Sequence, residues 1–314
     1  MRILFFGTPA FAVPTLAALA ASAHDVVGVV TQPDRPRGRG HRVVPGAVKA
    51  WAVGHGLHVL QPDRLKAPET LAALAALEPD LGVVAAYGRL LPQVLLDLPR
   101  LGLINVHASL LPRWRGAAPV HRAILAGDAT TGVTIMRVVL ALDAGPMLAR
   151  AETPIDPAET SGELEARLAE IGARQAVAVV DRLASGPVAG TPQDEAGVTY
   201  AHRLERADGR LDFARSAREV HDAIRGLQPW PQAAATFRGR RVLLRRSAPD
   251  PRDTDATPGT VIAAAPTGIV VATGRGAVRL IELQMEGRAP VDAGAFQRGY
   301  QVIPGDRFEP LPPA

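Results

Sequence analysis

The first two-thirds of the chain alternate short, continuous apolar runs with stretches of helical periodicity, and this alternation constrains the fold more than any other feature. The runs lie at Ile3–Phe6, Val26–Val30, Leu57–Leu60, Leu81–Ala85, Leu103–Val106, Val133–Val139 and Met147–Ala151. Continuous β-branched runs between helices indicate strands that are buried on both faces, as in a parallel sheet covered by helices. We therefore predict an α/β fold with a mostly parallel sheet, whose functional site lies at the carboxyl ends of the strands.

The last third of the chain has a different texture. Helical spacing over residues 161–183 ends at Ser185–Pro192, a Gly- and Pro-rich segment that is typical of a linker. Short strand-like runs follow, at Ala233–Phe237, Arg241–Arg245, Thr260–Ala264, Gly268–Thr273 and Ala277–Leu283. Short strands with turn signals between them predict a small barrel. The predicted organisation is a first domain at 1–186, a linker at 187–205 and an OB-fold-like β-barrel domain at 206–314.

The composition excludes several classes of function. The 314 residues contain no cysteine, which excludes a disulfide framework, a thiolate nucleophile and a Cys-ligated zinc site. The apolar run at Ile3–Phe6 is too short for a signal peptide, and no stretch of about 20 apolar residues could span a membrane. We expect a cytoplasmic protein without a metal and without membrane association.

Asn105 and His107 lie two positions apart at the end of a predicted buried strand. Side chains alternate along a strand, so these two point to the same face, where an open α/β sheet presents its catalytic groups. A neutral imidazole can exchange a proton near pH 7, and an amide can donate a hydrogen bond to an oxyanion. From spacing alone, two polar groups that merely cap the strand would look the same.

Asp143 lies in the segment Leu140–Pro146, between two strand-like runs. A carboxylate there could reach a histidine at the end of a neighbouring strand and orient its ring. An ordinary turn Asp before Gly and Pro would have the same local sequence.

Arginines at positions 35, 37, 39 and 42 lie in one segment interrupted by Gly and Pro. Such a segment cannot be a helix or a central strand. A basic loop beside the strand ends could bind phosphates, although a solvated loop is the more common identity of such a segment. Residues 206–314 hold 16 of the 35 basic and 12 of the 31 acidic residues, so the excess of +4 also lies there.

Together these motifs resemble the folate-dependent formyltransferase family over nearly the whole chain. The resemblance is carried by Phe6–Pro9, Gln32–Gly40, Ala86–Gly88, Asn105–Pro119, Gly132–Met136, Thr199–Ala201 and Pro229–Pro231. It implies a Rossmann-like first domain, an OB-fold-like second domain and 10-formyltetrahydrofolate as formyl donor. The turn at Gly7-Thr8-Pro9 lacks the spaced glycines of a dinucleotide site, so we expect no dinucleotide cofactor.

The resemblance also implies roles for individual residues. Asn105, His107 and Asp143 match the catalytic trio of the family. The positions that match the folate pocket are Ser109, Leu110, Leu111, Pro112, Ala86, Tyr87 and Gly88. Arg39 matches an arginine that approaches the acceptor stem of tRNA, and we group Arg35, Arg37 and Arg42 with it. The implied acceptor is the α-amino group of methionine on initiator tRNA, and we expect a monomeric enzyme.

One stretch departs from the family pattern. The branch that acts on tRNA usually reads Asp, x, Gly, Leu, Asp, Thr, Gly, Asp around the catalytic Asp, whereas residues 139–146 read Val-Leu-Ala-Leu-Asp-Ala-Gly-Pro. The ending Gly145-Pro146 is more similar to the glycinamide ribonucleotide branch. The difference bears on folate affinity and loop geometry more than on the chemistry.

Three alternatives stay open at this level. The acceptor could be a small amine, such as glycinamide ribonucleotide or an amino sugar nucleotide, or water could replace the amine and hydrolyse the donor. The non-enzyme alternative is an RNA-binding module with an inert first domain. Five closely spaced arginines in the last third could contact phosphates there, at 238, 240, 241, 245 and 246, but aromatic residues for base stacking are few.

Overall fold

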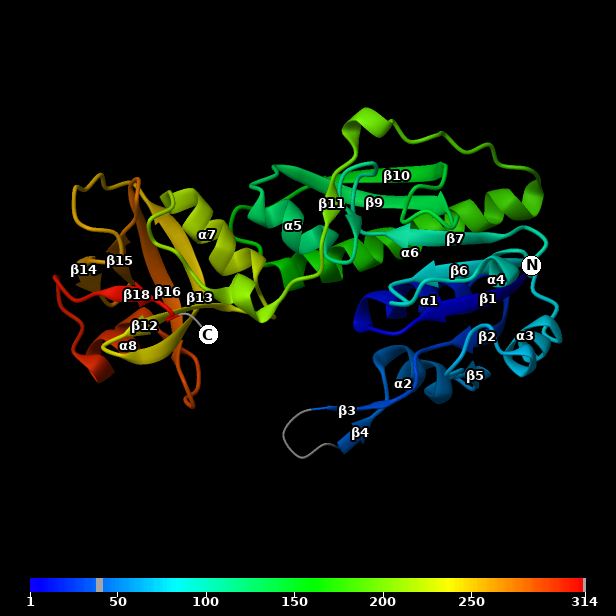
Figure 1. The fold of residues 1–314 in the computed structure, drawn as a ribbon, viewed down its shortest axis with the longest axis horizontal. Coiled ribbons are helices and arrows are strands. Elements are labelled where there is room, and N and C mark those ends of the chain that lie inside the picture. Colours follow the sequence, from blue (N-terminus) through cyan, green and yellow to red (C-terminus); the bar gives the residue numbers. More distant parts are fainter. Residues whose placement is uncertain (38–41, 313–314) are drawn as a thin grey trace. The chain divides into compact units, whose positions relative to one another are not determined.

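The computed structural model describes residues 1–37 and 42–312, which form two compact units. The first unit comprises Met1–Pro119, Thr131–Thr153 and Glu165–Ala201, and the second comprises Val120–Thr130, Pro154–Leu164 and His202–Ala314. Figure 1 shows the elements of both. No helix in the described ranges is long and apolar enough to cross a membrane.

The first unit is built on a sheet with the strand order β10-β9-β7-β6-β1-β2-β5. These strands are β1 (Arg2–Gly7), β2 (Asp25–Val30), β5 (Val59–Leu60), β6 (Leu81–Ala85), β7 (Leu103–His107), β9 (Thr130–Arg137) and β10 (Met147–Pro154). Pairing is parallel from β7 through β6, β1 and β2 to β5, whereas β9 runs antiparallel to β7. The predicted mostly parallel α/β sheet is confirmed. The apolar runs could not reveal the reversed direction of β9, because a buried strand has the same composition in either direction.

Helices connect the strands and cover the sheet. They are η1 (Ala10–Ala12), α1 (Val13–Ala20), α2 (Ala47–Gly54), α3 (Pro68–Ala75), α4 (Gln93–Leu96) and α6 (Ser161–Ser185), whereas α5 (Pro119–Leu125) belongs almost entirely to the second unit. α6 lies against β7 and β9, because a Cβ on its Gly172 would come within 2.7 Å of Val106 and 3.4 Å of Val133. On the opposite face of the sheet, Leu4, Phe6, Val30 and Val84 join one buried cluster. Burial on both faces explains why the sequence of these strands is continuously apolar.

The chain crosses from one half of the sheet to the other beside β1. It passes from β1 to β2 and β5 on one side, and then returns to β6 and β7 on the other. The carboxyl ends of β1, β2, β6 and β7 therefore lie next to one another at one edge of the sheet. This edge is where open α/β sheets place their ligands.

Two short pairings join segments outside the main sheet. The strands β3 (Arg35–Arg37) and β4 (Arg42–Val44) pair antiparallel, so the ends of the predicted basic loop form a hairpin. The strands β8 (Arg115–Gly116) and β11 (Tyr200–Ala201) pair parallel, and η2 (Glu195–Gly197) lies just before β11 in the chain.

The second unit contains an antiparallel sheet with the order β14-β15-β16-β13-β12-β18, and β17 pairs with β16. Its elements are η3 (Arg206–Gly209), α7 (Ala217–Gly226), β12 (Ala233–Phe237), β13 (Arg240–Asp250), β14 (Val261–Ala265), β15 (Gly268–Ala272), β16 (Ala277–Met285), β17 (Val291–Asp292), α8 (Ala293–Tyr300) and β18 (Phe308–Pro310). A bridge between Thr260 and Arg307 joins the two ends of this order. Val261 N donates to Asp306 O at 2.8 Å, and Gly305 N donates to Val261 O at 2.9 Å. The sheet therefore curls until its outer segments meet, as predicted for a small barrel.

Aromatic side chains fill the inside of this curled sheet. Phe237 lies 4.9 Å from Phe308 and 5.8 Å from Phe296 between ring centroids, and all three are buried. Rings that form the core cannot stack on exposed bases. These three rings of the second unit are therefore not available to stack on bases in the way that a single-strand RNA-binding module requires.

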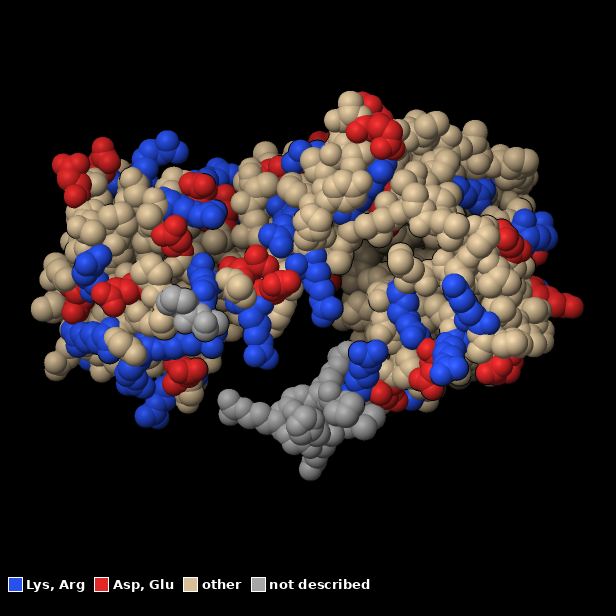
Figure 2. Space-filling view, in the orientation of Figure 1, with Lys and Arg blue, Asp and Glu red and all other residues tan. Residues whose placement is uncertain are grey.

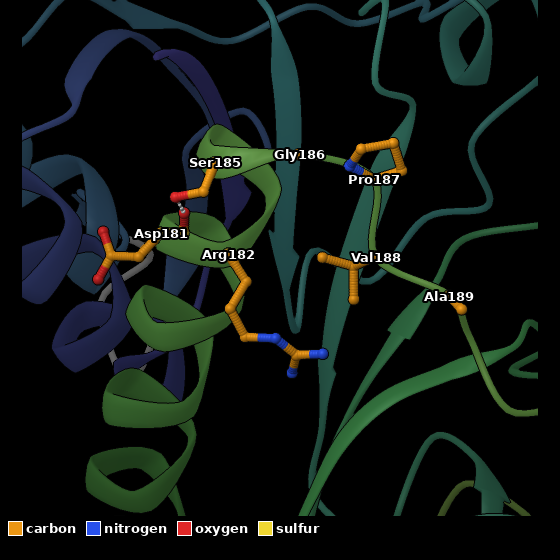
Figure 3. Close-up of a pocket in the computed structure, with 7 residues that line it drawn as sticks. All are labelled: Asp181, Arg182, Ser185, Gly186, Pro187, Val188 and Ala189. Atoms are coloured by element: carbon orange, nitrogen blue, oxygen red, sulfur yellow. Dashed lines mark hydrogen bonds between the residues drawn. The ribbon is translucent and has the colours of Figure 1, made fainter.

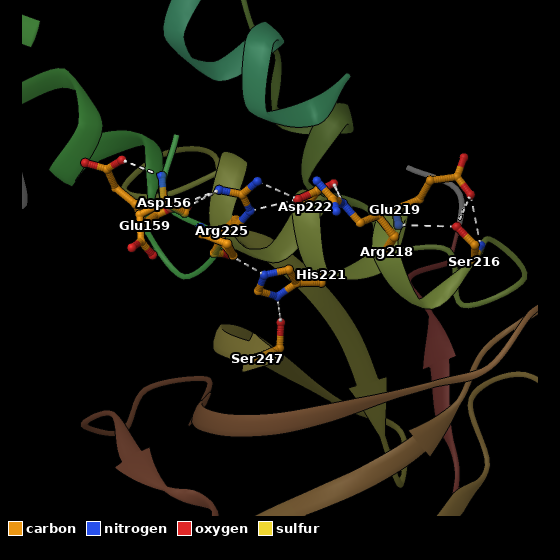
Figure 4. Close-up of polar contacts among 10 residues, drawn as sticks. Asp156, Glu159, Ser216, Arg218, Glu219, His221, Asp222, Arg225 and Ser247 are labelled. Carbon is orange, nitrogen blue, oxygen red and sulfur yellow. Dashed lines mark hydrogen bonds and ion pairs between the residues drawn. The ribbon is translucent and has the colours of Figure 1, made fainter. Parts of the chain in front are cut away.

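A buried polar network fastens α7 to the segment before α6 within the second unit (Figure 4). His221 Nε2 donates to Pro157 O at 2.8 Å, and its Nδ1 faces Ser247 Oγ at 3.0 Å. Arg225 binds the Asp222 carboxylate at 2.7 Å and donates to Asp156 O and Glu159 O, both at 3.1 Å. The charges of Arg225 and Asp222, which are 3% and 2% exposed, thus compensate each other, as buried charges must.

His221 makes the stability of the second unit depend on pH. Burial lowers the pKa of His221 below 6.5, and the cations Arg225 and Arg218 lower it further, against smaller opposite effects of the Pro157 carbonyl and Asp222. The unfolded chain therefore binds more protons than the folded one as pH falls below about 6.5, so stability falls with it. We expect His221→Gln to flatten the dependence of the melting temperature on pH between about 6.5 and 5.

The measurement is thermal unfolding of the wild-type chain and the variant across this range. His121, whose pKa burial also lowers, remains in both proteins and sets the residual slope. An equal slope in the two proteins would contradict the assignment. Exposed His202→Gln is the control, and we expect it to leave the slope unchanged.

Candidate active site

Asn105 and His107 lie at the carboxyl end of β7, between β6 and β9. In the register, Asn105 pairs with Met136 and His107 with Thr134 of β9. His107 is only 5% exposed, whereas Asn105 is half-buried. Among residues 1–37 and 42–312, no side chain or backbone group forms a hydrogen bond with the Asn105 amide. The amide is therefore available to a ligand.

Asp143 reaches the imidazole of His107 from the loop between β9 and β10. Its Oδ2 lies 3.7 Å from His107 Nδ1, and the two side chains are 15% and 6% exposed. The other ring nitrogen, Nε2, lies 3.0 Å from Trp114 O. Because a carbonyl oxygen only accepts, Nε2 carries a proton in this arrangement and Nδ1 faces the carboxylate. A carboxylate so placed orients the ring.

The backbone of the loop that carries Asp143 is tightly constrained. Asp143 itself has φ +47°, in the left-handed region, and its Oδ2 accepts from Gly116 N at 2.8 Å. A Cβ at Gly145 would lie 1.8 Å from Arg137 O, so only glycine permits this close approach. These contacts hold the carboxylate against β8 and the loop against the end of β9.

Several positions that match the folate pocket support the site from within the protein. Ser109 is buried and its Oγ donates to Arg113 O at 2.6 Å. Leu111 is also buried, and its N–H donates to Thr134 Oγ1 at 3.1 Å. The side chains of Leu110 and Pro112 are half-buried and retain surface that a ligand could contact.

The segment Ala86–Gly88 follows β6, and its parts face different ways. The Tyr87 ring is 1% exposed and packs edge-on to Phe6 at 5.6 Å, inside the core. Its carbonyl accepts from Gln32 Nε2 at 2.7 Å and from Thr8 Oγ1 at 3.3 Å. Ala86 and Gly88 are exposed and have φ +45° and +79°. The backbone of this segment and the Ala86 side chain can therefore contact a ligand, whereas the Tyr87 ring cannot.

The base of the basic hairpin is anchored to the same edge of the sheet. Asp34 forms an ion pair with Lys49 and accepts from Gln61 Nε2 at 3.0 Å, and these hydrogen bonds hold the pKa of Asp34 below 3.8. Gln61 also donates to Gln32 O at 2.9 Å. Lys49 and Gln61 could not be predicted from the sequence, because they come from other segments and belong to no motif.

The predicted arginines of the hairpin differ in what the structure describes. Arg35 is exposed, and Arg37 and Arg42 pair through their backbones in β3 and β4. Arg39 lies outside the described residues. The hairpin places this basic segment after β2, on the side of the sheet where the strands end.

Most of the closely spaced arginines in the second unit have acidic partners. Arg238 binds Asp306 at 2.8 Å and Arg245 binds Glu282 at 2.9 Å, while Arg241 lies 3.9 Å from Glu286 and Arg246 pairs with Glu163. Figure 2 shows blue and red side chains interspersed on the visible face. A phosphate bound here would compete with these carboxylates, so a simple count of arginines overstates the free positive charge.

The loop before Asp143 is apolar and exposed. Val139, Leu140 and Leu142 are 40%, 62% and 49% exposed. They place apolar surface next to the Asp143 carboxylate. Of these three positions only Val139 departs from the family pattern, since position 140 is free in that pattern and position 142 is Leu in both.

A separate surface hollow of about 550 Å³ lies where α6 ends (Figure 3). Its lining includes Asp181 and Ser185, and neither side chain is free. Asp181 pairs with His24 at 2.8 Å, and Ser185 Oγ donates to Asp181 O at 3.0 Å. The hollow contains none of the trio and is not the candidate site.

Two family models match this chain: Formyl transferase over residues 1–180, and Formyl transferase, C-terminal domain over residues 203–301. The chain belongs to the formyl transferase family. Many relatives named methionyl-tRNA formyltransferase are similar over nearly their whole length. The protein of Ectopseudomonas mendocina is 50% identical over 307 residues, which cover 97% of each chain. That of Methylococcus capsulatus is 49% identical, with 96% of this chain and 98% of the relative covered.

Solved structures share the fold at low sequence identity. The sugar 3N-formyl transferase WlaRD superposes with a TM-score of 0.67 at 14% identity, over 92% of this chain and 99% of that one. HypX from Aquifex aeolicus, solved in complex with tetrahydrofolic acid, gives a TM-score of 0.63 at 19% identity, over 95% of this chain and 48% of that one. The two-domain formyltransferase fold predicted from the sequence is confirmed.

Proposed function

We propose that this chain is a methionyl-tRNA formyltransferase, which transfers the formyl group of 10-formyltetrahydrofolate to the α-amino group of methionyl initiator tRNA. The observation that carries the proposal is the identity of about half of all residues with relatives of that name over nearly the full length. The approach of Asp143 to His107, at 3.7 Å beside the free amide of Asn105, supports it chemically.

The reaction needs two hydrogen-bond donors for an oxyanion and a route for one proton, and this trio can supply them. The neutral amine attacks the formyl carbon, a new C–N bond forms, and the carbonyl oxygen becomes an oxyanion. Asn105 donates a hydrogen bond to this oxyanion through its free amide. His107 donates a second hydrogen bond from Nε2–H, which replaces its bond to Trp114 O. The bond from the formyl carbon to N10 of the folate then breaks, and N10 takes up a proton.

Asp143 would assist removal of the proton that the amine loses. The attacking amine carries a surplus proton after the C–N bond forms, and a nearby base must accept it. Asp143 faces His107 Nδ1 and can stabilise the imidazolium or take the proton through a water molecule. No acyl-enzyme intermediate is required, so the chain needs no nucleophilic cysteine.

Two groups of residues would bind the substrates. Folate would lie along Ser109–Pro112 and Ala86–Gly88, where Leu110, Pro112, Ala86 and the backbone offer surface. The basic residues Arg35, Arg37, Arg39 and Arg42 would contact the acceptor stem of the tRNA. A charged tRNA and a folate are substrates of the cytoplasm, where we expect the chain to act as a monomer.

The acceptor is tested by a parallel assay. The purified chain is given 10-formyltetrahydrofolate with methionyl initiator tRNA, methionyl elongator tRNA, glycinamide ribonucleotide, an amino sugar nucleotide or water alone. We expect the initiator tRNA to be formylated with a kcat/KM at least 100-fold above the other acceptors, since a discrimination of about 3 kcal/mol is within reach of specific contacts. Preference for a small amine, or hydrolysis alone, would contradict the proposal.

The catalytic trio is tested by truncation. We expect Asn105→Ala and His107→Ala to lower kcat by about 10²–10³, because each removes one donor to the oxyanion. Steady-state kinetics with methionyl initiator tRNA provides the measurement, and melting temperatures check the fold. Ser185→Ala, in the hollow at the end of α6, is the control that we expect to keep full activity. Near-normal turnover in either trio variant would refute its role.

The basic hairpin is tested through salt. Phosphate contacts release counterions, so we expect the KM for initiator tRNA to rise steeply with salt. Arg39→Ala should raise this KM and lower the slope of log KM against log salt by about 0.7–0.9, the value of one phosphate contact. Arg100→Ala, which removes an exposed arginine paired with Asp80, is the control. A KM that does not depend on salt would count against a tRNA acceptor.

A further inference from the structure

The segment that follows α6 returns across both loops of the candidate active site. Thr191 forms a two-way bridge with Met147, in which each N–H donates to the other's carbonyl at 2.8 Å. Further along, Thr199 O accepts from Arg115 N at 2.9 Å, and Ala201 O accepts from Ala117 N at 2.9 Å. One stretch of chain, residues 191–201, therefore holds the loop of Asp143 and the loop of Trp114 together. We call it the crossing segment.

Gln193 lies in the middle of the crossing segment, and its side-chain amide is used in full. The Nε2 group donates to Asp143 O at 2.8 Å and to Gly145 O at 2.9 Å. The Oε1 atom accepts from Arg115 Nε at 3.0 Å. An amide side chain has two N–H donors and one carbonyl acceptor, and here each of them has a partner.

These contacts close a ring around the carboxylate. Arg115 is followed by Gly116, whose N–H donates to Asp143 Oδ2 at 2.8 Å. Gln193 thus joins the backbone of Asp143 to the strand that binds the Asp143 side chain. Since the residue is held at both its backbone and its carboxylate, its distance from His107 depends on this bridge.

The surroundings require an amide at this position. Two backbone carbonyls need donors, which excludes a carboxylate, and the nearly buried guanidinium of Arg115 needs an acceptor, which excludes a lysine. Asp143 also has φ +47°, a strained backbone for a residue with a side chain. The hydrogen bonds from Gln193 to the carbonyls of Asp143 and Gly145 oppose its relaxation to an ordinary conformation.

We propose that Gln193 is a positioning residue for formyl transfer, which acts by holding the Asp143 carboxylate beside His107. The inference rests on the proposed role of Asp143. Gln193 touches no reacting atom, so its removal should act on the chemical step and not on substrate binding. A misplacement of about 1 Å at a catalytic group can lower the rate by roughly 10²-fold.

The first test is Gln193→Met, which keeps the length of the side chain and removes its three hydrogen bonds. We expect kcat to fall by about 10- to 100-fold, while the KM values for both substrates stay within about twofold. Gln193→Glu, which keeps the acceptor for Arg115 but loses both donors, should show the same pattern. Glu195→Gln is the matched control, because Glu195 also contacts Arg115 at 3.1 Å but is exposed and does not reach the Asp143 loop.

The decisive test combines Gln193→Met with Asp143→Asn. If Gln193 acts through Asp143, the double variant should be no slower than Asp143→Asn alone, whereas independent effects would multiply. Multiplied losses, a loss confined to KM, or an unchanged kcat in Gln193→Met would each overturn the proposal.

The result is separable from the proposed function. Every variant is compared with the wild-type chain on whichever acceptor the wild type formylates. An acceptor other than methionyl initiator tRNA would therefore overturn the proposed function and still test Gln193. Melting temperatures of the variants are measured alongside, and the Gln193→Glu pair decides the outcome if Gln193→Met does not fold.

Discussion

The carboxylate of Asp143 is the point on which the geometry of the site depends. One of its oxygens accepts from Gly116 N at 2.8 Å and lies 3.7 Å from His107 Nδ1. The end of β7 and the short strand β8 meet at this atom, and the close contact between Gly145 and Arg137 O constrains the loop that carries it. The sheet supplies the rigidity, because β7 is central and buried on both faces, so the two polar residues at its end cannot shift without disturbing the core.

In the second unit, aromatic side chains form the core and most of the clustered arginines are paired with carboxylates. Its phenylalanines fill the curled sheet and are buried there. Most of its clustered arginines are paired with carboxylates of the same unit, so the surface has less free positive charge than its composition suggests. This arrangement suits a domain that contributes shape and weak electrostatic attraction to a folded polyanion better than one that stacks on unpaired bases.

The loop at 139–146 differs from the family pattern in several side chains but still brings Asp143 to His107. It lacks the two other acidic residues usual in the branch that acts on tRNA, and exposed Val139 and half-buried Pro146 stand at those positions. Yet the position of Asp143 does not depend on those side chains. It depends on the left-handed backbone at 143, the glycine at 145 and contacts from distant segments, all of which remain compatible with the altered sequence.

The sequence by itself determined the two-domain α/β architecture, because runs buried on both faces must be continuously apolar and a curled sheet needs frequent turns. It also placed Asn105 and His107 on one face, since strand periodicity is local. Only the tertiary structure decided that Asp143 meets His107, that the Tyr87 ring turns into the core, and that Gln193 and Lys49 serve the site. These contacts join residues far apart in the chain, and no local pattern encodes a hydrogen bond between segments whose approach is set by the packing of the whole unit.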